Sequence, residues 1–463
     1  MSIAANSSVH AQKQHIPLLK KLIWAYLILL FIEGALRKWV LPQLSAPLLL
    51  VRDPVAIWII WEAYRTQKWP RQWSVAAGLL AVVLIPLAIV QMVALSAPWF
   101  VVLYGLRSYL LPFPVAFIIG SYLDRDDVEQ IGRWILLLLI PTVLLEIAQY
   151  RADASSWLNA GAYAGGSQIG YTGEHVRASG TFSYVAGPML FIPLAAAFLF
   201  YGLANPEFTR NKKWMLWTAA AAVVLSVPVT GSRTLIFTLA ATLLCVMIAS
   251  MLGVSQFAGT LKAVAAMLII GAAVSLLPVF SDATESMTRR FSDASNGEGG
   301  AQESFILRTV SPITDTIAYS FDSSNWLGVG MGYGSNVASK LLTGDLVFLV
   351  AENEFPRLIG ELGPPVGIGF MLFRFCLALA FIIKGLERAR ERDTLSWLFV
   401  PVTCSTLVMG ILEQPTEQGF LVVSIGFTLA ALKRQKVQVS QLTTPVQGMF
   451  NRSQWQPQVF SSR

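Results

Sequence analysis

Residues 74–95 read SVAAGLLAVVLIPLAIVQMVAL and contain no charged side chain. A run of about 20 apolar residues is long enough to cross the roughly 30 Å of hydrocarbon in a bilayer as a helix. Similar runs recur along the whole chain, which is 55% hydrophobic and only 13% charged. A soluble domain carries roughly 25% charged residues, so this composition predicts an integral membrane protein.

The pattern of apolar runs predicts an all-α polytopic membrane protein with about twelve transmembrane helices. A tail of residues 1–17 precedes the membrane domain (18–433), and a second tail (434–463) follows it. Two connections, 151–181 and 281–356, are long. The predicted spans are 18–36, 46–64, 74–95, 99–121, 132–150, 182–202, 214–229, 233–252, 260–280, 357–383, 396–412 and 417–433.

Lysine and arginine residues predict how these spans are oriented. Basic clusters such as Lys20–Lys21, Arg210–Lys213 and Arg388–Arg392 fall in alternate connections. Because cytoplasmic loops carry the excess of positive charge, both termini are expected to be cytoplasmic. Both long connections are then expected on the outer side, the larger one between the ninth and tenth spans.

Several arginines break this rule, because they lie on the outer side or at outer span ends. The sixth, eighth and tenth spans each begin there with an arginine, in HVRASGTF (175–182), VTGSRTLIF (229–237) and ENEFPRLIG (352–360). Helix N-termini and guanidinium groups together form an anion site. Outside a cell there is no ATP, so the expected phosphate is a lipid-linked pyrophosphate. Ion pairing with loop carboxylates, or snorkelling to headgroups, is the alternative. The arginines are Arg177, Arg233, Arg289, Arg290, Arg308 and Arg357.

The tenth span also begins with acidic residues, Glu352 and Glu354, and carries Glu361 four residues after Arg357. One carboxylate can accept the proton of a reacting hydroxyl group, with Arg357 keeping it ionised. The alternative is an ion-paired cap on the span, with Glu361 bonded to a neighbouring helix. Within the membrane, Arg107 and Arg374 are costly and expected to be paired.

Two further patterns suggest no cofactor. The glycine-rich GVGMGYG (328–334) lacks the lysine and the strand–helix context of a nucleotide-binding loop, so it is interpreted as a tight packing turn. The three cysteines all lie in apolar runs, which predicts neither a disulfide framework nor a thiolate metal site.

Four stretches occur along the chain in a fixed order: VRASGTFSYVAGPMLFIPLA (176–195), VTGSRTLIFTLAATLL (229–244), LRTVSPITDTIAYSFDSSNWLGVGMGYG (307–334) and AENEFPRLIGELGPPVG (351–367). Together they resemble the O-antigen ligase and polymerase superfamily of Wzy/WaaL-like membrane glycosyltransferases. A fifth stretch, GALRKWVLPQLSAPLLLVRDP (34–54), looks like a subgroup associated with exopolysaccharide polymerisation.

The resemblance implies metal-independent, inverting glycosyl transfer at the outer face of the bacterial inner membrane. The donor is a glycan on undecaprenyl pyrophosphate, and the expected partners are lipids, a chain-length regulator and export machinery, with no nucleic acid. Arg233 and Arg308 match the family's pyrophosphate-binding arginines, and Arg177 aligns with the arginine ahead of the GTF motif. Glu352-Asn353 stands where the family often has His-Asn, with Asn353 placed to orient a sugar hydroxyl.

Two other functions remain open at this point. A ligase would transfer the glycan to lipid A-core, but ligases depend on the histidine that Glu352 replaces, which favours a polymerase. A transporter or flippase of lipid-linked sugars is the alternative from another class. Such carriers usually consist of two similar halves, and no such repeat is visible here.

The predicted orientation has a direct test. Single cysteines introduced at Ser295 and at Asn211, in a background without Cys245, Cys376 and Cys404, should differ in reactivity toward an impermeant maleimide added to intact cells. We expect labelling at position 295 and protection at position 211. The opposite pattern would overturn both the orientation and the outer anion site.

Overall fold

The computed structural model describes the chain in several ranges separated by gaps. Only the backbone is described for residues 2–17, 72, 74, 171, 172 and 175. The described residues are 2–67, 69–162, 171–172, 175–210, 212–254, 259–265, 269, 285, 326–344, 349–351 and 353–433. Most of the predicted span 260–280, most of the connection 281–356 and the tail 434–463 therefore lie outside them.

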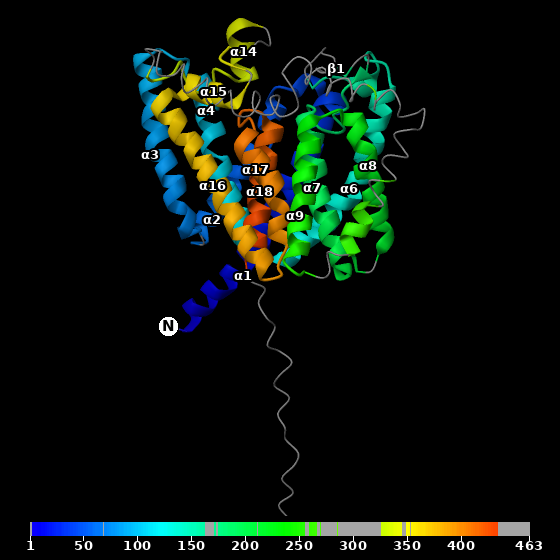
Figure 1. The fold of residues 1–463 in the computed structure, drawn as a ribbon. Helices are drawn as coiled ribbons and strands as arrows, with labels where there is room; N and C mark the ends of the chain where they lie inside the picture. The colour runs from blue at the N-terminus through cyan, green and yellow to red at the C-terminus, as the bar shows by residue number, and fades with distance from the viewer. Residues whose placement is uncertain are drawn as a thin grey trace, which may run out of the picture. The chain divides into compact units, whose positions relative to one another are not determined.

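The described part is almost entirely helical, as the apolar pattern predicts (Figure 1). The N-terminal helices are α1 (Ser2–Ala35), α2 (Asp53–Arg65), α3 (Arg71–Ala94), α4 (Trp99–Leu110), α5 (Pro112–Tyr122) and α6 (Arg125–Arg151). The later ones are α7 (Ala186–Ala204), α8 (Lys213–Thr230), α9 (Arg233–Met251), α14 (Asn336–Thr343), α15 (Glu354–Leu362), α16 (Pro364–Arg390), α17 (Leu395–Met409) and α18 (Pro415–Ala431).

Short elements join these helices. A π-helical turn η1 (Leu36–Val40) follows α1 directly, and the antiparallel pair β1 (Tyr171–Thr172) and β2 (His175–Val176) lies between α6 and α7. The 3-10 turns are η2 (Pro42–Leu44), η3 (Pro47–Leu50), η4 (Trp157–Asn159) and η5 (Pro206–Thr209).

Seven helices among the described residues are long and apolar enough to cross a membrane. This supports a membrane-embedded helical protein, while the number twelve and the orientation stay predictions. The seven are Val75–Ala94, Trp99–Tyr122, Arg125–Arg151, Ala186–Ala204, Lys213–Thr230, Arg233–Met251 and Pro364–Arg390.

Two predicted spans differ from the structure. The run 357–383 is not one helix, because Gly363 adopts a left-handed conformation (φ +76°) and separates α15 from α16. A side chain at Gly363 would also meet the backbone of Trp326, so both conformation and space require glycine there. The run 46–64 contains only a 13-residue helix, α2, preceded by 3-10 turns.

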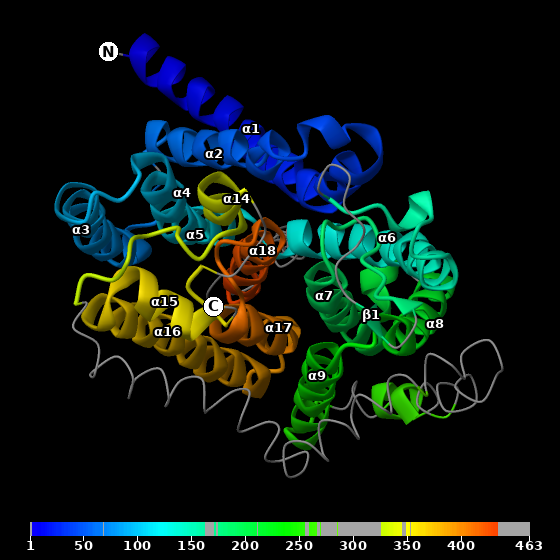
Figure 2. The ribbon, with the colours of Figure 1, turned by 90° about the horizontal axis from the view of Figure 1, so that it is seen from above.

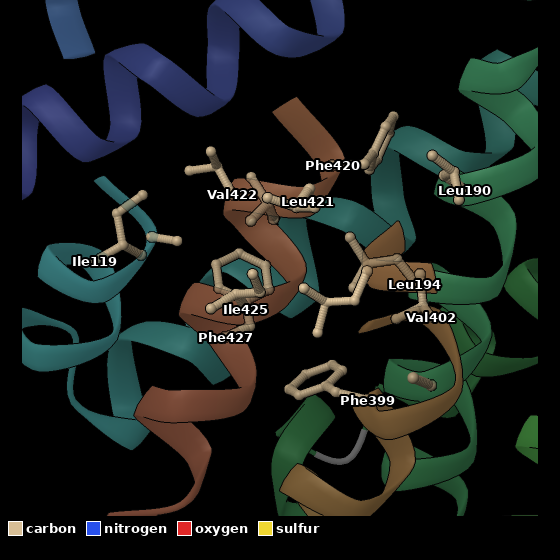
Figure 3. Close-up of a cluster of buried hydrophobic side chains, with 14 of the residues drawn as sticks. Ile119, Leu190, Leu194, Phe399, Val402, Phe420, Leu421, Val422, Ile425 and Phe427 are labelled. Atoms are coloured by element: carbon tan, nitrogen blue, oxygen red, sulfur yellow. The ribbon is translucent and has the colours of Figure 1, made fainter. Parts of the chain in front are cut away.

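Burial separates central helices from peripheral ones. The apolar window of α7 is 89% buried and that of α3 only 22% buried, so α3 presents its apolar side chains outward, as a lipid-facing helix does. Figure 3 shows the central contact, where Phe420, Leu421 and Phe427 of α18 lie among side chains of α5, α7 and α17.

One end of the bundle carries most of the irregular structure. In Figures 1 and 2, α14, α15 and β1 lie at this end, which we call the α15 end. It is the end that the charge pattern predicts to be outside. All the predicted site residues that the structure describes belong to it.

Candidate functional site

Arg357 of α15 lies at the centre of a buried ionic cluster. Its side chain is 2% exposed and contacts three carboxylates. Its Nε donates to Glu354 Oε2 at 3.0 Å, and its Nη1 lies 3.2 Å from Glu361 Oε1 and 3.1 Å from Glu413 Oε2. The hydroxyl of Tyr109 on α4 accepts a further bond from Nη1 at 3.1 Å. Arg357 is therefore surrounded by acceptors from three different segments.

A second arginine, Arg374 of α16, completes this cluster. Its Nη1 donates to Glu354 Oε1, so Glu354 bridges two guanidinium groups. Nε and Nη2 donate to the carbonyls of Leu407 and Gly410, both at 2.6 Å. Arg374 thus ties α16 to the end of α17, and its predicted pairing is confirmed.

The other intramembrane arginine, Arg107 of α4, is also paired as predicted. Its Nε and Nη2 bind the two carboxylate oxygens of Asp53, each at 2.6 Å. The two parallel bonds fix the start of α2 against α4, because a guanidinium and a carboxylate match in this fork geometry.

The glycine-rich segment 328–334 wraps around Glu361 and is a packing turn, as interpreted from the sequence. The amides of Gly332 and Gly334 donate to its two carboxylate oxygens at 2.9 and 2.7 Å. Tyr109 donates to the same carboxylate at 2.7 Å. Gln91 of α3 fixes the segment further by accepting from the Met331 amide. The expected bond from Glu361 to a neighbouring helix is therefore present.

The protonation of this cluster follows from burial. Burial and the neighbouring Glu361 carboxylate raise the pKa of Glu413 well above its usual value, and Arg357 opposes this only in part. Burial lowers the pKa of Arg357, but the carboxylate of Glu354 and its neighbours hold that pKa well above the usual value. Glu413 therefore favours its neutral form, while Arg357 keeps its positive charge.

The anion-binding role of Arg357 and the proton-accepting role of Glu354 stay predictions; what the structure gives is their ion pairing. Both side chains are buried and occupied by each other and by Arg374, Glu361 and Glu413. This geometry matches the alternative reading, an ion-paired cap. Of the neighbouring candidates, Asn353 is exposed and its carbonyl accepts from the Arg357 amide at 3.1 Å. Glu352 and Arg308 lie outside the described residues.

Arg177 and Arg233 form a second group at the same end. Arg233 is the first residue of α9, after Ser232, whose hydroxyl caps the helix by accepting from the Leu235 amide at 3.3 Å. Both arginine side chains are half-buried. Ala178, next to Arg177, belongs to one small buried cluster with Tyr150 and Val229, and Val229 lies four residues before Arg233. The fold therefore brings the two arginine-bearing segments to the same place.

A basic pair that follows α1 is attached to the Arg177 segment. Lys38 Nζ donates to Ser179 Oγ and, at 3.1 Å, to the carbonyl of Gly180. Arg37 Nη1 donates to Ser183 Oγ at 2.9 Å. Lys38 and Arg37 are only 3% and 2% exposed. The motif at 34–54 and the motif at 176–195 are thus in direct contact.

Gln149 of α6 holds the same segment in place. Its Oε1 accepts from the amides of Ser179 and Gly180 at 3.2 and 2.8 Å, and its Nε2 donates to the Gly180 carbonyl at 3.2 Å. On the other side of Gly180 lies Glu146, which is 0% exposed and has no hydrogen-bond partner for either carboxylate oxygen among the described residues.

Sequence reasoning missed Lys38, Glu413 and Glu146 as members of these clusters. Their position in the sequence could have identified them, because each is a charged residue at or near the predicted outer end of an apolar run. What the sequence does not contain is the partner, because Lys38 and Ser179 are 141 positions apart.

Protonation of Glu413 predicts a pH-dependent stability. A carboxyl whose pKa is raised on folding stabilises the native state at low pH, and this contribution is lost as pH rises through the native pKa. The melting temperature of the detergent-solubilised wild type should fall as the pH rises above 4.5, the ordinary carboxyl pKa, and Glu413→Gln should show a flatter profile. Glu361→Gln should lower the melting temperature throughout, because Arg357 loses a carboxyl partner. Equal slopes in wild type and Glu413→Gln would contradict the neutral state.

Comparison with known proteins identifies no family for this chain. No model of a known protein family matches the chain, and no curated protein is significantly similar to it. Function is therefore inferred from the residues of this chain.

Proposed function

We propose that the chain is a multi-pass glycosyltransferase of the cell inner membrane. In this proposal it polymerises undecaprenyl-pyrophosphate-linked repeat units into exopolysaccharide or O-antigen at the outer face. The observation that carries the proposal is the meeting of two half-buried arginine segments, those of Arg177 and Arg233, at the α15 end.

The distribution of charge supports an anion at this position. Arg357 and Arg374 both contact carboxylates inside the ionic cluster, which compensate their positive charge there. Arg233, in contrast, lies at the N-terminus of the 19-residue helix α9, where the amide groups and the helix dipole add positive potential. A pyrophosphate carries several negative charges on oxygens that a guanidinium group binds in pairs.

The reaction proposed is a direct displacement at the anomeric carbon of the donor sugar. A hydroxyl group of the acceptor forms the new C–O bond, and the bond from the anomeric carbon to the pyrophosphate oxygen breaks. The pyrophosphate leaves with the bonding electron pair, and the arginines stabilise the charge that develops on it. The hydroxyl proton passes to a carboxylate, and attack opposite the leaving group inverts the anomeric centre.

Glu352 is the carboxylate that we propose as proton acceptor. Glu354 is held by two guanidinium groups and buried, so its lone pairs are occupied. Glu352 stands beside the exposed Asn353 in the sequence, at the start of α15. Arg308 remains part of the proposed pyrophosphate site through the family resemblance alone.

Arg233 gives the central test of the anion site. Arg233→Ala should lower the rate of extension of a purified lipid-linked repeat unit on the order of 10²–10³-fold, as expected for the loss of one preorganised contact to a developing anion. Arg233→Lys should rescue poorly, because an ammonium group cannot form the fork. The product of the assay also distinguishes the three candidate functions. A polymerase yields polymer, a ligase yields glycan on lipid A-core, and a transporter leaves the lipid-linked sugar unchanged. Normal extension by well-folded Arg233→Ala would remove this residue from the site.

Substitutions of Glu352 and of Glu354 should affect different properties of the protein. Glu352→Gln should abolish extension and leave the melting temperature near that of wild type, because it removes a proton acceptor. Glu354→Gln should lower the melting temperature, because two buried guanidinium groups lose their shared partner. Extension and thermal unfolding are measured on the same preparations. Wild-type turnover in Glu352→Gln would exclude it as the base.

A further inference from the structure

Glu146 on α6 is a buried acid whose side chain has no bonding partner in the described part of the chain. It is 0% exposed, and neither carboxylate oxygen has a hydrogen bond or an ion pair there. Arg107 and Arg374 also lie in apolar helices, but each is paired and ties two segments together. Glu146 makes no such contribution to the fold, so its presence in an apolar helix suggests a use other than helix packing.

The polar neighbours of Glu146 on α6 have partners of their own. Thr142, one turn earlier, donates to the carbonyl of Leu138 at 2.8 Å. Gln149, three residues later, uses both ends of its amide group on the turn Ser179–Gly180. Neither side chain therefore donates to the carboxyl group of Glu146.

Ionisable side chains on the elements that pack against α6 do not compensate Glu146 either. These elements are α7, α8, α18, β2, η4 and η5. Wherever their side chains are described, none bonds to Glu146 or acts on it by its charge. The ionisable residues of these elements are Tyr201 of α7, Lys213 of α8, Glu417 of α18, His175 of β2 and Glu207 of η5.

The turn Ser179–Gly180 covers the carboxyl group of Glu146. Gly180 has a left-handed conformation (φ +57°), and a Cβ atom there would lie 3.3 Å from Glu146 Oε1 and 3.1 Å from Thr142 Cγ2. Glycine thus allows the backbone to lie directly against the acid. Arg177 precedes this turn by two positions. Movement of the turn would therefore admit water to the acid and displace the segment that carries Arg177.

A carboxyl group in this setting holds its proton. An ionised carboxylate without a donor or a counter-charge costs far more in an apolar interior than a neutral acid does. In water, by contrast, a glutamate side chain ionises at about pH 4.3. The covered and the water-exposed states of Glu146 therefore bind different numbers of protons at neutral pH.

We propose that Glu146 is a proton-binding site that the turn Ser179–Gly180 opens and closes. The carboxyl group keeps its proton while the turn covers it. When the turn moves away, the O–H bond breaks, the proton passes to water and the electron pair stays on the carboxylate. The ligand of this site is a proton, and the inference does not depend on the proposed function, because it involves no bound anion or sugar.

Linkage gives the direction of the pH effect. Above about pH 4.3 the open state binds one proton fewer than the covered state, so opening becomes more favourable as pH rises, by up to about tenfold per pH unit. The increase ends where the covered acid itself ionises. Gln149 does not titrate and keeps the turn closed in most molecules, so the effect concerns the small open fraction.

Hydrogen exchange measures this open fraction, because the amides of Ser179 and Gly180 exchange when their bonds to Gln149 Oε1 break. The full chain in detergent is followed by mass spectrometry of peptides that contain both amides, with correction for the intrinsic effect of pH on exchange. From about pH 5 to about pH 8, the corrected exchange of wild type should rise by up to about tenfold per unit. In Glu146→Gln, which has no proton to release, it should not change with pH.

Glu129→Gln is the matched control. Glu129 lies on the same helix and is paired there with Arg125 and Tyr201, so its loss should leave the wild-type rise unchanged. Glu146→Leu is a second neutral variant and should behave as Glu146→Gln does. Both neutral variants should fold, because the native carboxyl group is neutral and makes no hydrogen bond within the described residues.

Each outcome decides the matter. A rise in wild type and in Glu129→Gln that is absent from Glu146→Gln or Glu146→Leu supports the proposal. Exchange in wild type that does not depend on pH overturns it. An equal rise in the neutral variants also overturns it and assigns the effect to another group, such as Lys38, which bonds to the same turn. Failure of both neutral variants to fold overturns it as well, since the fold would then need an ionised carboxylate.

Discussion

The bridging of Arg357 and Arg374 by Glu354 is the interaction on which the α15 end depends. It joins α15 to α16, and the further partners of the two arginines reach α4 and the connection between α17 and α18. Each guanidinium is buried, and loss of Glu354 would remove the carboxylate that Arg374 contacts and one of the three that Arg357 contacts. The side chains of such a cluster can adopt few alternative arrangements, and the cluster therefore fixes the positions of the neighbouring loops.

The ionic cluster also bears on the proposed anion site. Because Arg357 is neutralised by carboxylates inside the protein, our proposal places the anion at the basic residues around α7 and α9. Arg177 and Arg233 lie there, and the buried pair Arg37 and Lys38 supports the segment that carries Arg177. Charge that is costly in a membrane is thus used for structure at one side of the α15 end and for recognition, in our proposal, at the other.

Much of the helical framework could be predicted from the sequence, because apolar runs and caps are local signals. The pairing of Arg107 and Arg374 followed from the cost of a charge inside an apolar run. The break at Gly363 did not, since a left-handed glycine inside an apolar run is visible only once Trp326 packs against it. The ion pairing of Arg357 was predicted only as an alternative, and its partner Glu413 could not be predicted because it is distant in sequence.

Gln91 and Gln149 have a consequence of a different kind. Each uses one neutral amide to fix a loop backbone at the α15 end, in the glycine-rich segment and at Ser179–Gly180. An amide does not titrate, and its bonds to backbone groups are little affected by dissolved ions. A surface that faces a medium of changing acidity and salinity can therefore keep the shape of these two loops while the ionisable groups beside them respond to it. Geometry and charge are in this way controlled by separate sets of side chains.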